Sequence, residues 1–466
     1  MEELELSGWW WLPDNEDKKV PGVMTFSNEE GIRLKLIGSF KELPQLGSAE
    51  EHPLILGSTG EGKLVTLFDA IPLRTSFTSG GFTTQEFWAR VGCTGAQFLQ
   101  AEQARFHKAS LEYTHLADWV GRSGFHPDYD TEGGSLTKYR LAYTFPDEVK
   151  AAIPDGEVCV TYAFESGGDL LREVSLRQSA RIRVDLGHDL TLDEWWSDFV
   201  LPFRNLLTLA TTRPNALTRI SVYSEDKTVS TSKGDREVPV DLFYQQVWHE
   251  KVQAKRLFPH DMLFTLHDVA EDFGAVVKHW LRVAKELDSV CNLFFSVSHL
   301  PGLYSENQFL NTVQAAESYH RRRIRNRVLP RALHRERVRS IFHQVPAEHE
   351  EWLKQVLAYS NEPTLRHRMS DLLDVTQEVV SPLITDQDGF VRKVVDTRNY
   401  FTHYDPHLRS KAATRSELHW LRETLSFMVE ACLLRELGLA AERRRDLFQR
   451  NRRYVYAVSH KGQTDC

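Results

Sequence analysis

Residues 391–406 read VRKVVDTRNYFTHYDP, a helical pattern that carries two chemically useful side chains. Valines and aromatic residues recur at helical spacing, and the Asp405-Pro406 step predicts a stop, because the residue before a proline is pushed out of the α region. Arg398 is followed by Asn399, and His403 comes five positions after the arginine. An arginine that neutralises phosphate charge and a histidine that moves a proton suit cleavage of a phosphodiester.

The spacing of this pair is weak evidence by itself. The alternative is that Arg398, Asn399 and His403 only form hydrogen bonds within a helical bundle, as buried polar groups must. On a straight helix, residues five apart point about 140° away from each other, so Arg398 and His403 do not share a face. We therefore expect a frayed end at His403, which lets the histidine turn back, or a site shared between two copies of the chain. Three further pairs have four to six intervening residues: Arg181 and His188, Arg327 and His334, Arg337 and His343.

The stretch belongs to a series of helical patterns that begins near residue 268. Apolar residues at three- or four-residue spacing predict an all-α bundle in the C-terminal part. The predicted helices are 269–296, 307–327, 347–359, 364–380, 389–404 and 412–437.

Residues 1–190 show alternation with glycine and proline punctuation instead, which indicates β-structure. Thr191 and Glu194 form a capping box, which predicts a helix to about Thr211 with a bend at Pro202. The polar segment 224–237 predicts a mobile loop. Strands are predicted at 32–36, 64–68, 158–164, 171–186, 217–223 and 240–247.

These patterns predict an α+β multidomain protein. Its N-terminal domain is β-rich, sandwich- or barrel-like, with inserted helices, and its C-terminal domain is an all-α helical bundle. The predicted bounds are 1–267 for the β-rich domain, 268–302 for a connecting helix, 303–450 for the helical domain and 451–466 for a C-terminal tail.

Composition narrows the class of protein. The net charge is −8, but residues 301–466 carry 27 Lys and Arg against 21 Asp and Glu, which favours a polyanion-binding C-terminal part over an unevenly charged surface. No apolar run could span a membrane, the N-terminus lacks the pattern of a signal peptide, and the five cysteines form no CxxC. We therefore expect a cytoplasmic protein. With no HExxH, GxGxxG or Walker A pattern, we expect no metal and no cofactor.

Arginines cluster in two places. Nine of them fall within residues 321–339, with Glu336 as the one acid. A phosphate-binding surface for RNA is one interpretation and a solvated helix face is the other. A second cluster at 443–453 is followed by Tyr454 and Tyr456, which suit base stacking or belong to a loose tail. The residues assigned to RNA binding are Arg321, Arg322, Arg323, Arg325 and Arg327.

The stretch DTRNYFTHY resembles the signature of the HEPN superfamily: an arginine, usually followed by a polar residue, with a histidine four to six residues on. The N-terminal residues Gly8-Trp9-Trp10-Trp11-Leu12-Pro13, with Lys19-Val20-Pro21-Gly22 and Gly31-Ile32-Arg33-Leu34, resemble the N-terminal domain of the ApeA family. The two resemblances lie at opposite ends of the chain and together cover nearly all of it.

The resemblance implies a bacterial antiphage protein of the abortive-infection type, with a metal-independent HEPN endoribonuclease that cuts tRNA in the anticodon region. His403 would deprotonate the ribose 2′-OH or protonate the leaving 5′ oxygen, and Arg398 would stabilise the phosphorane. Asn399 would orient the phosphate or His403. The products would carry a 2′,3′-cyclic phosphate and a 5′-OH. Asp396 is assigned a supporting role, and Glu317 would hold Arg398, although an i,i+4 pair of Glu317 with Arg321 is simpler.

The resemblance also implies partners: tRNA, a second copy of the chain in a homodimer or higher oligomer, and a phage-encoded trigger protein. The N-terminal domain would restrain the nuclease until infection. The rival interpretation is a non-catalytic scaffold that keeps the HEPN fold for dimerisation or RNA binding. A carbohydrate- or peptide-binding role for the β-rich domain rests on fold class alone, which does not determine function.

Overall fold

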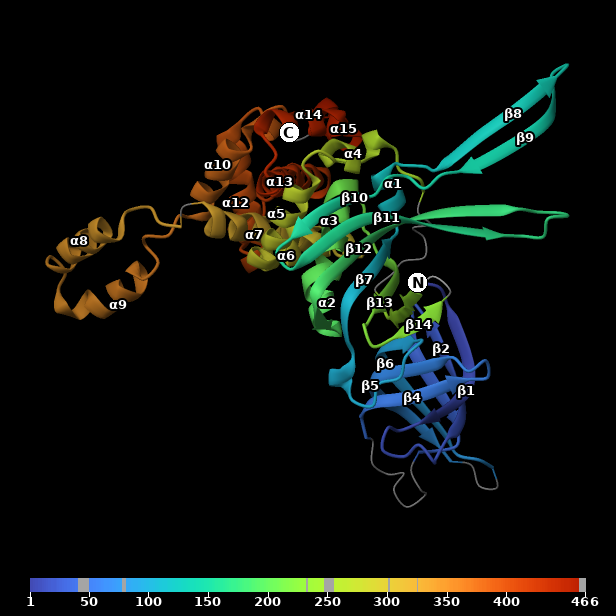
Figure 1. Cartoon of the computed structure of the whole chain (residues 1–466). Coiled ribbons are helices and arrows are strands. Elements are labelled where there is room, and N and C mark those ends of the chain that lie inside the picture. The colour runs from blue at the N-terminus through green and yellow to red at the C-terminus, as the bar shows by residue number, and fades with distance from the viewer. Residues whose placement is uncertain are drawn as a thin grey trace. The chain divides into compact units, whose positions relative to one another are not determined.

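The computed structural model describes residues 1–40, 50–77, 81–231, 234–246, 255–300, 302–324 and 326–460. The chain divides into two compact units, Met1–Leu281 and Arg282–Cys466. The division lies inside helix α5 (Phe273–Glu286), within the segment 268–302 predicted as a connecting helix. A β-rich N-terminal part followed by a helical C-terminal part confirms the predicted fold class (Figure 1).

Six strands of the first unit close into an antiparallel barrel (Figure 1). They are β1 (Leu4–Trp11), β2 (Val20–Ser27), β3 (Gly31–Ile37), β4 (His52–Thr59), β5 (Leu64–Ser76) and β6 (Thr84–Thr94). Strand β5 pairs with both β4 and β6, so the ring β6-β3-β2-β1-β4-β5 is closed. Closure leaves no unpaired edge in the ring. The predicted strands at 32–36 and 64–68 lie on β3 and β5.

The tryptophan run at residues 9–11 lies on β1. Trp10 is 1 % exposed and Trp11 4 %, whereas Trp9 is 53 % exposed. The Trp10 indole packs over Gly57, its partner across the β1–β4 pair, where a Cβ would collide with the ring. Its Nε1 donates to the carbonyl of Gly22 at 3.1 Å. Trp10 and Trp11 are therefore part of the barrel core, whereas Trp9 is not.

The sheet continues beyond the barrel from β6 through six more antiparallel strands. In sheet order these are β16 (Val240–Tyr244), β13 (Leu217–Tyr223), β7 (Arg105–Tyr113), β12 (Ser175–Thr191), β11 (Gly156–Gly167) and β10 (Val149–Ile153). They include the strands predicted at 158–164 and 217–223 in full. Of those predicted at 171–186 and 240–247, the strand parts begin at Ser175 and end at Tyr244, and Val247 lies outside the described residues.

Two smaller hairpins accompany this sheet: β8 (Phe125–Glu132) with β9 (Ser135–Tyr143), and β14 (Thr228–Thr231) with β15 (Gly234–Glu237). The second hairpin occupies the segment 224–237, where a mobile loop was predicted. That prediction was wrong for residues 228–231 and 234–237. Their side chains are largely polar, so the sequence lacks the apolar alternation by which a strand is recognised.

The predicted helix after Thr191 is present in three consecutive pieces: α2 (Leu192–Trp195), a π-helical segment η3 (Trp196–Val200) and α3 (Leu201–Thr211). Its capping box is confirmed, because the Thr191 hydroxyl accepts from the amide of Glu194 at 3.3 Å and the Glu194 carboxylate accepts from the amide of Thr191 at 2.8 Å. A π-helical segment precedes Pro202, where a bend was predicted.

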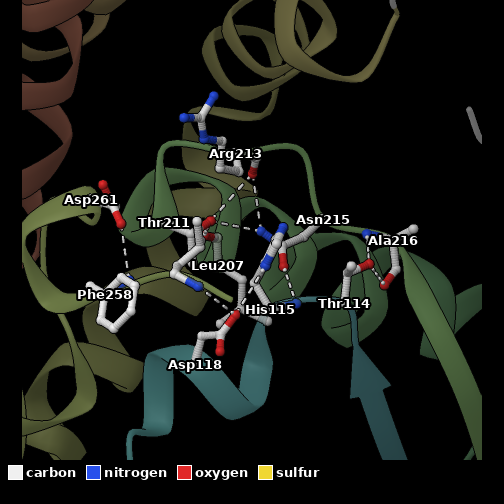
Figure 2. A network of polar contacts seen from close by, with 11 residues as sticks. Thr114, His115, Asp118, Leu207, Thr211, Arg213, Asn215, Ala216, Phe258 and Asp261 are labelled. Atoms are coloured by element: carbon white, nitrogen blue, oxygen red, sulfur yellow. Dashed lines mark hydrogen bonds and ion pairs between the residues drawn. The ribbon is translucent and has the colours of Figure 1, made fainter. Parts of the chain in front are cut away.

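A buried polar network joins the end of α3 to α1 (Leu116–Val120) and to the start of β13 (Figure 2). Asn215 donates to Thr211 Oγ1 at 2.9 Å and accepts from the amide of His115 at 3.2 Å. Thr212, with φ 53°, turns the chain at the end of the helix. Asn215 therefore connects three elements that are far apart in sequence. Further short helices of this unit are η2 (Ala101–Gln103), η4 (Pro259–Asp261) and α4 (Leu266–Val269).

The second unit is a helical bundle built around α13 (Arg415–Glu436), much of which is buried. It contains the helices predicted from residue 307 onward, with 364–380 divided into α10 and α11. The predicted helix 269–296 spans the division between the units and is split into α4, α5 and α6. Its other helices are α6 (Asp288–His299), α7 (Ser305–Arg323), α8 (Arg331–Phe342), α9 (Ala347–Leu357), α10 (Leu365–Val375), α11 (Gln377–Val380), α12 (Gln387–His403), η5 (Pro406–Leu408), α14 (Ala441–Arg450) and α15 (Arg452–Ser459).

Helices α8 and α9 form an arm in which no residue from 326 to 362 is buried (Figure 1). The base of the arm is closed by Asn361, whose side chain accepts from the amide of Leu329 at 2.8 Å and donates to its carbonyl at 3.0 Å. The arm therefore adds surface to the unit without adding to its core.

Residues 451–459, assigned to a C-terminal tail, fold as α15. Tyr454 is 3 % exposed and donates its hydroxyl to the carbonyl of Val379 at 2.5 Å. The interpretation of Tyr454 as a base-stacking residue is therefore wrong, because its ring lies in the core. No helix in the described ranges is long and apolar enough to cross a membrane.

Candidate active site and nucleic-acid interface

Helix α12 positions all three predicted catalytic residues. Asp386 caps its start by accepting from the amide of Gly389 at 2.9 Å. Val391, Val394 and Thr397 form its buried face, with three-residue spacing. Arg398 and Asn399 lie at the border of that face and are half-buried, whereas His403 is exposed in the last turn. The alternative was that Arg398, Asn399 and His403 only form hydrogen bonds within the helical bundle. Because His403 is exposed, this alternative does not apply to it.

The helix remains regular through His403. Tyr404 then takes the left-handed conformation, with φ 51°, and the Asp405 carboxylate accepts from the amide of His407 at 2.9 Å. The predicted stop at Asp405-Pro406 is confirmed. The expected frayed end at His403 is wrong, because Tyr404 absorbs the change of direction. Arg398 and His403 thus keep the divergence of about 140° that a regular helix imposes.

Arg398 has a partner within the motif. Its Nη1 donates to Asn399 Oδ1 at 3.2 Å. Among the described residues, no hydrogen bond or ion pair joins Arg398 to His403 or to Glu317. Asp396 is half-buried two positions before Arg398. The amide oxygen of Asn399 therefore orients the guanidinium, while His403 lies on another side of the helix.

A residue that the sequence did not single out fixes this helix in place. Thr397 is fully buried, and its Oγ1 accepts from the amide of Ala413 at 2.9 Å. Ala413 lies just before α13, so the hydrogen bond ties the motif helix to the start of the central helix. Nothing in a single sequence marks Thr397, because its partner lies across a turn that only the fold defines.

Glu317 belongs to a second polar cluster. It lies 3.9 Å from Arg321, its i,i+4 neighbour on α7, and 3.9 Å from Arg368 on α10. His320, fully buried, contacts Asp371 at 2.8 Å through Nε2 and Arg368 at 3.1 Å through Nδ1. Within one chain, the simpler interpretation of Glu317 as the partner of Arg321 is the one seen.

Burial lowers the pKa of His320, although Asp371 acts in the opposite direction. A neutral imidazole with Nε2 protonated donates to Asp371 and accepts from Arg368 at Nδ1, which satisfies both ring nitrogens. This cluster lies at the foot of the arm, because Arg368 also donates to Asn326 Oδ1 at 2.8 Å. Its members are about 50 positions apart in sequence, and no motif connects them.

Most of the arginines assigned to RNA binding have acidic partners inside the unit. Arg321 pairs with Glu362 at 3.1 Å and Arg322 with Asp288 at 3.5 Å. Arg323 pairs with both Glu286 and Glu436. Arg325 lies outside the described residues. Arg327 is exposed and has no ion pair in the described part of the chain. Much of the charge predicted to meet RNA is therefore neutralised.

The second arginine cluster is also partly internal. Arg444 is 7 % exposed and pairs with Glu378, and Arg453 pairs with Glu423 at 2.8 Å and Glu430 at 2.7 Å. These ion pairs bind α14 and α15 to the bundle. The prediction of a loose tail is wrong for this part because the arginines satisfy buried carboxylates.

The arm carries a different kind of arginine. Arg331, Arg335 and Arg339 recur every four residues on α8, and Arg337 lies on another side of the helix. All four are exposed, and among the described residues no carboxylate pairs with them. Helix α8 therefore presents an unneutralised row of guanidinium groups about 6 Å apart along its axis.

Two family models match the chain. ApeA N-terminal domain 1 matches residues 5–280, and Apea-like HEPN matches residues 310–443. The chain belongs to the ApeA family. No curated protein and no solved structure matches it.

The two ApeA matches follow the structural division. The N-terminal model ends one residue before Leu281, the last residue of the first unit. The HEPN model covers α12 with Arg398, Asn399 and His403. This combination of domains is that of a HEPN-type nuclease of antiphage defence. HEPN domains typically bind RNA and dimerise. In the described residues, no three His, Cys, Asp or Glu side chains form a group that could hold a metal ion.

Proposed function

We propose that the chain is a metal-independent endoribonuclease that cleaves tRNA, in the anticodon loop, to stop translation during phage infection. The observation that carries the proposal is the geometry of α12 within the HEPN match: Arg398 is oriented by Asn399, and His403 is exposed at the end of the same helix. Such a site supplies a cation for phosphate and a group that transfers protons.

In this mechanism His403 removes the proton from the ribose 2′-OH, or donates one to the leaving 5′ oxygen. Attack of the 2′ oxygen on phosphorus forms the P–O2′ bond as the P–O5′ bond breaks, leaving a 2′,3′-cyclic phosphate and a 5′-OH. A positioned acid or base contributes roughly 10²–10⁴-fold to the rate. Arg398, held by Asn399, stabilises the charge on the phosphorane, an electrostatic contribution of similar or larger size.

A shared site follows from the helix geometry. Arg398 and His403 diverge by about 140° on a regular helix, so a single phosphate is poorly placed to touch both from one chain. We propose that two copies of α12 meet in a homodimer, with Arg398 of one copy and His403 of the other acting on the same phosphate. Supporting roles for Asp396 and Glu317 remain part of this proposal.

The decisive experiment incubates the purified protein with total tRNA in EDTA and analyses the fragment ends. Cleavage with 2′,3′-cyclic phosphate ends is expected for the wild type, and His403→Ala should abolish it without loss of RNA affinity. His407→Ala is the matched control, because His407 is exposed four residues further on and should be dispensable. Unchanged cleavage by His403→Ala would falsify the assignment. RNA binding without any cleavage by the wild type would favour the non-catalytic scaffold.

We also propose that the N-terminal unit restrains the nuclease until a phage-encoded protein triggers it, since an unregulated tRNA nuclease would kill its host. Expression of residues 282–466 alone should then be more toxic to cells than expression of the full chain. The same segment with His403→Ala should be harmless. Equal or lower toxicity of the active segment, shown to be folded and expressed at the same level, contradicts the restraint.

A further inference from the structure

The N-terminal unit contains a cavity of about 250 Å³ whose walls combine aromatic and aliphatic side chains. Trp88 on β6, Trp195 and Trp196 on the helix after Thr191, and Tyr244 on β16 contribute rings to it. The volume lies just below the range of roughly 300–1,000 Å³ that is usual for drug-sized ligands. The cavity therefore suits a small molecule built on one ring system.

The π-helical segment forms one wall of this cavity. Trp195 is 1 % exposed and donates its indole N–H to the carbonyl of Phe106 at 2.9 Å, which fixes the helix on the sheet. The next residue, Trp196, begins η3 and is half-buried, with its ring edge-on to Tyr244 at 4.4 Å between centroids. π-Helical turns are rare and occur frequently at functional sites.

The cavity has hydrogen-bond donors that the protein does not use. In the described part of the chain, the indole N–H groups of Trp88 and Trp196 have no acceptor. The indoles of Trp10, Trp195 and Trp280 each donate to a backbone carbonyl. Trp88 and Trp196 are both half-buried, so their indole N–H groups are open to solvent and available to the acceptor atoms of a ligand.

The one cation that lines the cavity, among the described residues, is already paired with carboxylates. Arg90, which lines it, pairs with Asp69 at 2.7 Å and with Asp193 at 2.8 Å, so one guanidinium faces two carboxylates. A phosphate at this rim would find no free cation and would lie close to the Asp193 carboxylate, and like charges repel. The charge therefore favours an uncharged ligand over a nucleotide.

We propose that this cavity binds a nucleobase in uncharged form, as a nucleoside or free base. The aromatic rings stack on the planar heterocycle, and the free indole N–H groups donate to its ring nitrogens or carbonyl oxygens. The site lies wholly in the N-terminal unit, so it is separate from the RNA phosphate that the HEPN motif is proposed to cut. It gives the N-terminal unit a ligand of its own.

The test is isothermal titration calorimetry on the full-length protein carrying His403→Ala, which prevents RNA cleavage from contributing heat. The probes are adenosine, guanosine, cytidine and uridine, each with its 5′-monophosphate. At least one nucleoside should bind with a Kd below about 1 mM, equivalent to roughly 4 kcal/mol. Its monophosphate should bind at least several-fold more weakly.

Substitutions inside and outside the cavity distinguish binding in the cavity from nonspecific binding elsewhere on the protein. Trp196→Leu should lower nucleoside affinity by about tenfold through lost stacking, and Trp88→Phe should lower it less because it keeps a ring. Trp9→Leu, at an exposed tryptophan outside the cavity, should change nothing. Asp193→Asn should reduce the difference in affinity between a nucleoside and its monophosphate, because it removes a negative charge at the rim of the cavity. Unchanged near-ultraviolet circular dichroism establishes that each variant is folded.

Four results would overturn the proposal. One is the absence of nucleoside binding at about 1 mM. Another is tighter binding of every monophosphate, which contradicts the argument from rim charge. A third is binding that Trp196→Leu and Trp9→Leu weaken equally. The last is a preference for single-stranded oligonucleotides over every nucleoside, which would assign the cavity to RNA. None of these results bears on cleavage by His403, so the nuclease proposal is tested separately.

Discussion

Asn399 contributes to the motif through one oxygen atom, which accepts from the guanidinium of Arg398 at 3.2 Å. The sequence suggested that Asn399 orients either the phosphate or His403, and the hydrogen bond shows a third arrangement, in which it orients Arg398. The presence of an asparagine after Arg398 indicated a residue that orients another group, but the sequence did not predict which group it orients. An amide one position from an arginine on a helix can turn in several directions, and only packing selects one.

His320 leads to a prediction about pH. Its pKa is lowered by burial, so in the folded state it stays neutral at pH values where a histidine in the unfolded chain, with a pKa near 6.5, is protonated. The unfolded state then binds more protons, and stability falls as the pH decreases through that range. The groups that face His320 are Asp371, Arg368 and Glu317.

The measurement is Tm by differential scanning calorimetry between about pH 8 and pH 5, the range in which histidine titrates. His320→Gln keeps a donor and an acceptor but cannot titrate, so its Tm should fall less than that of the wild type over this range. His343→Gln, at an exposed histidine, should follow the wild type. If Tm falls equally with decreasing pH in His320→Gln and in the wild type, His320 does not contribute to the pH dependence of stability.

At the scale of the element, helix α8 was absent from the predicted helices. Its residues are mainly charged, and none is buried, so it has no apolar stripe facing a core. Pattern reading finds helices whose apolar residues recur at helical spacing, such as α12, α13 and the unburied α9, and passes over helices dominated by charged residues. The same weakness explains α14, in which three consecutive arginines obscure the buried positions Leu447 and Phe448.

The unpaired arginines of α8 predict where RNA phosphates bind. Replacing Arg331, Arg335 and Arg339 together by Gln should lower RNA affinity without regard to RNA sequence, because phosphate contacts read no bases. The slope of log K against log salt should become shallower by about 2, at roughly 0.7 for each lost contact with a single strand. Fluorescence anisotropy with labelled tRNA, in the His403→Ala background, gives both quantities.

The control removes equal charge elsewhere. Arg33, Arg172 and Arg236 are exposed residues of the N-terminal unit, and their replacement by Gln changes the net charge by the same amount. This control should keep the salt slope of the parent protein. A similar loss in both triple variants would show that only total charge matters. An unchanged slope for the α8 variant would remove the arm from the RNA interface.

At the scale of the whole molecule, Arg398 and His403 point in different directions from α12, which predicts a site shared between two copies of the chain. Two inactive variants, each lacking a different one of these residues, should therefore complement each other. Co-expression of Arg398→Ala and His403→Ala chains should restore cleavage, because a mixed dimer contains one site with Arg398 from one copy and His403 from the other. Random pairing in a two-fold dimer makes about half of the dimers mixed, with one intact site in two, so roughly a quarter of wild-type activity is expected.

The complementation is measured as tRNA cleavage after both chains are purified through one shared tag, which keeps the random mixture of dimers. Each variant alone is the control, and a chain carrying both substitutions, co-expressed with His403→Ala, should stay inactive because no pairing restores a site. Inactive mixed dimers would mean that each site is built within one chain. The α12 helix would then have to bend when RNA binds.

The sequence by itself determined the order of the domains, the helix that carries Arg398, Asn399 and His403, and the capping box at Thr191. These are local patterns, in which backbone geometry and apolar spacing act over a few residues. The resemblance at both ends of the chain was sufficient for the ApeA family, which the family models confirm.

Only the tertiary structure decided which polar groups are free. Arg321, Arg322 and Arg323 look like an RNA-binding run, yet carboxylates from Glu362, Asp288, Glu286 and Glu436 neutralise them. Arg331, Arg335 and Arg339 are indistinguishable from them in sequence and have no carboxylate partner in the described ranges. The difference is physical: a charge pairs with whatever the fold brings within reach, and such long-range neighbours are not encoded in the spacing along one chain.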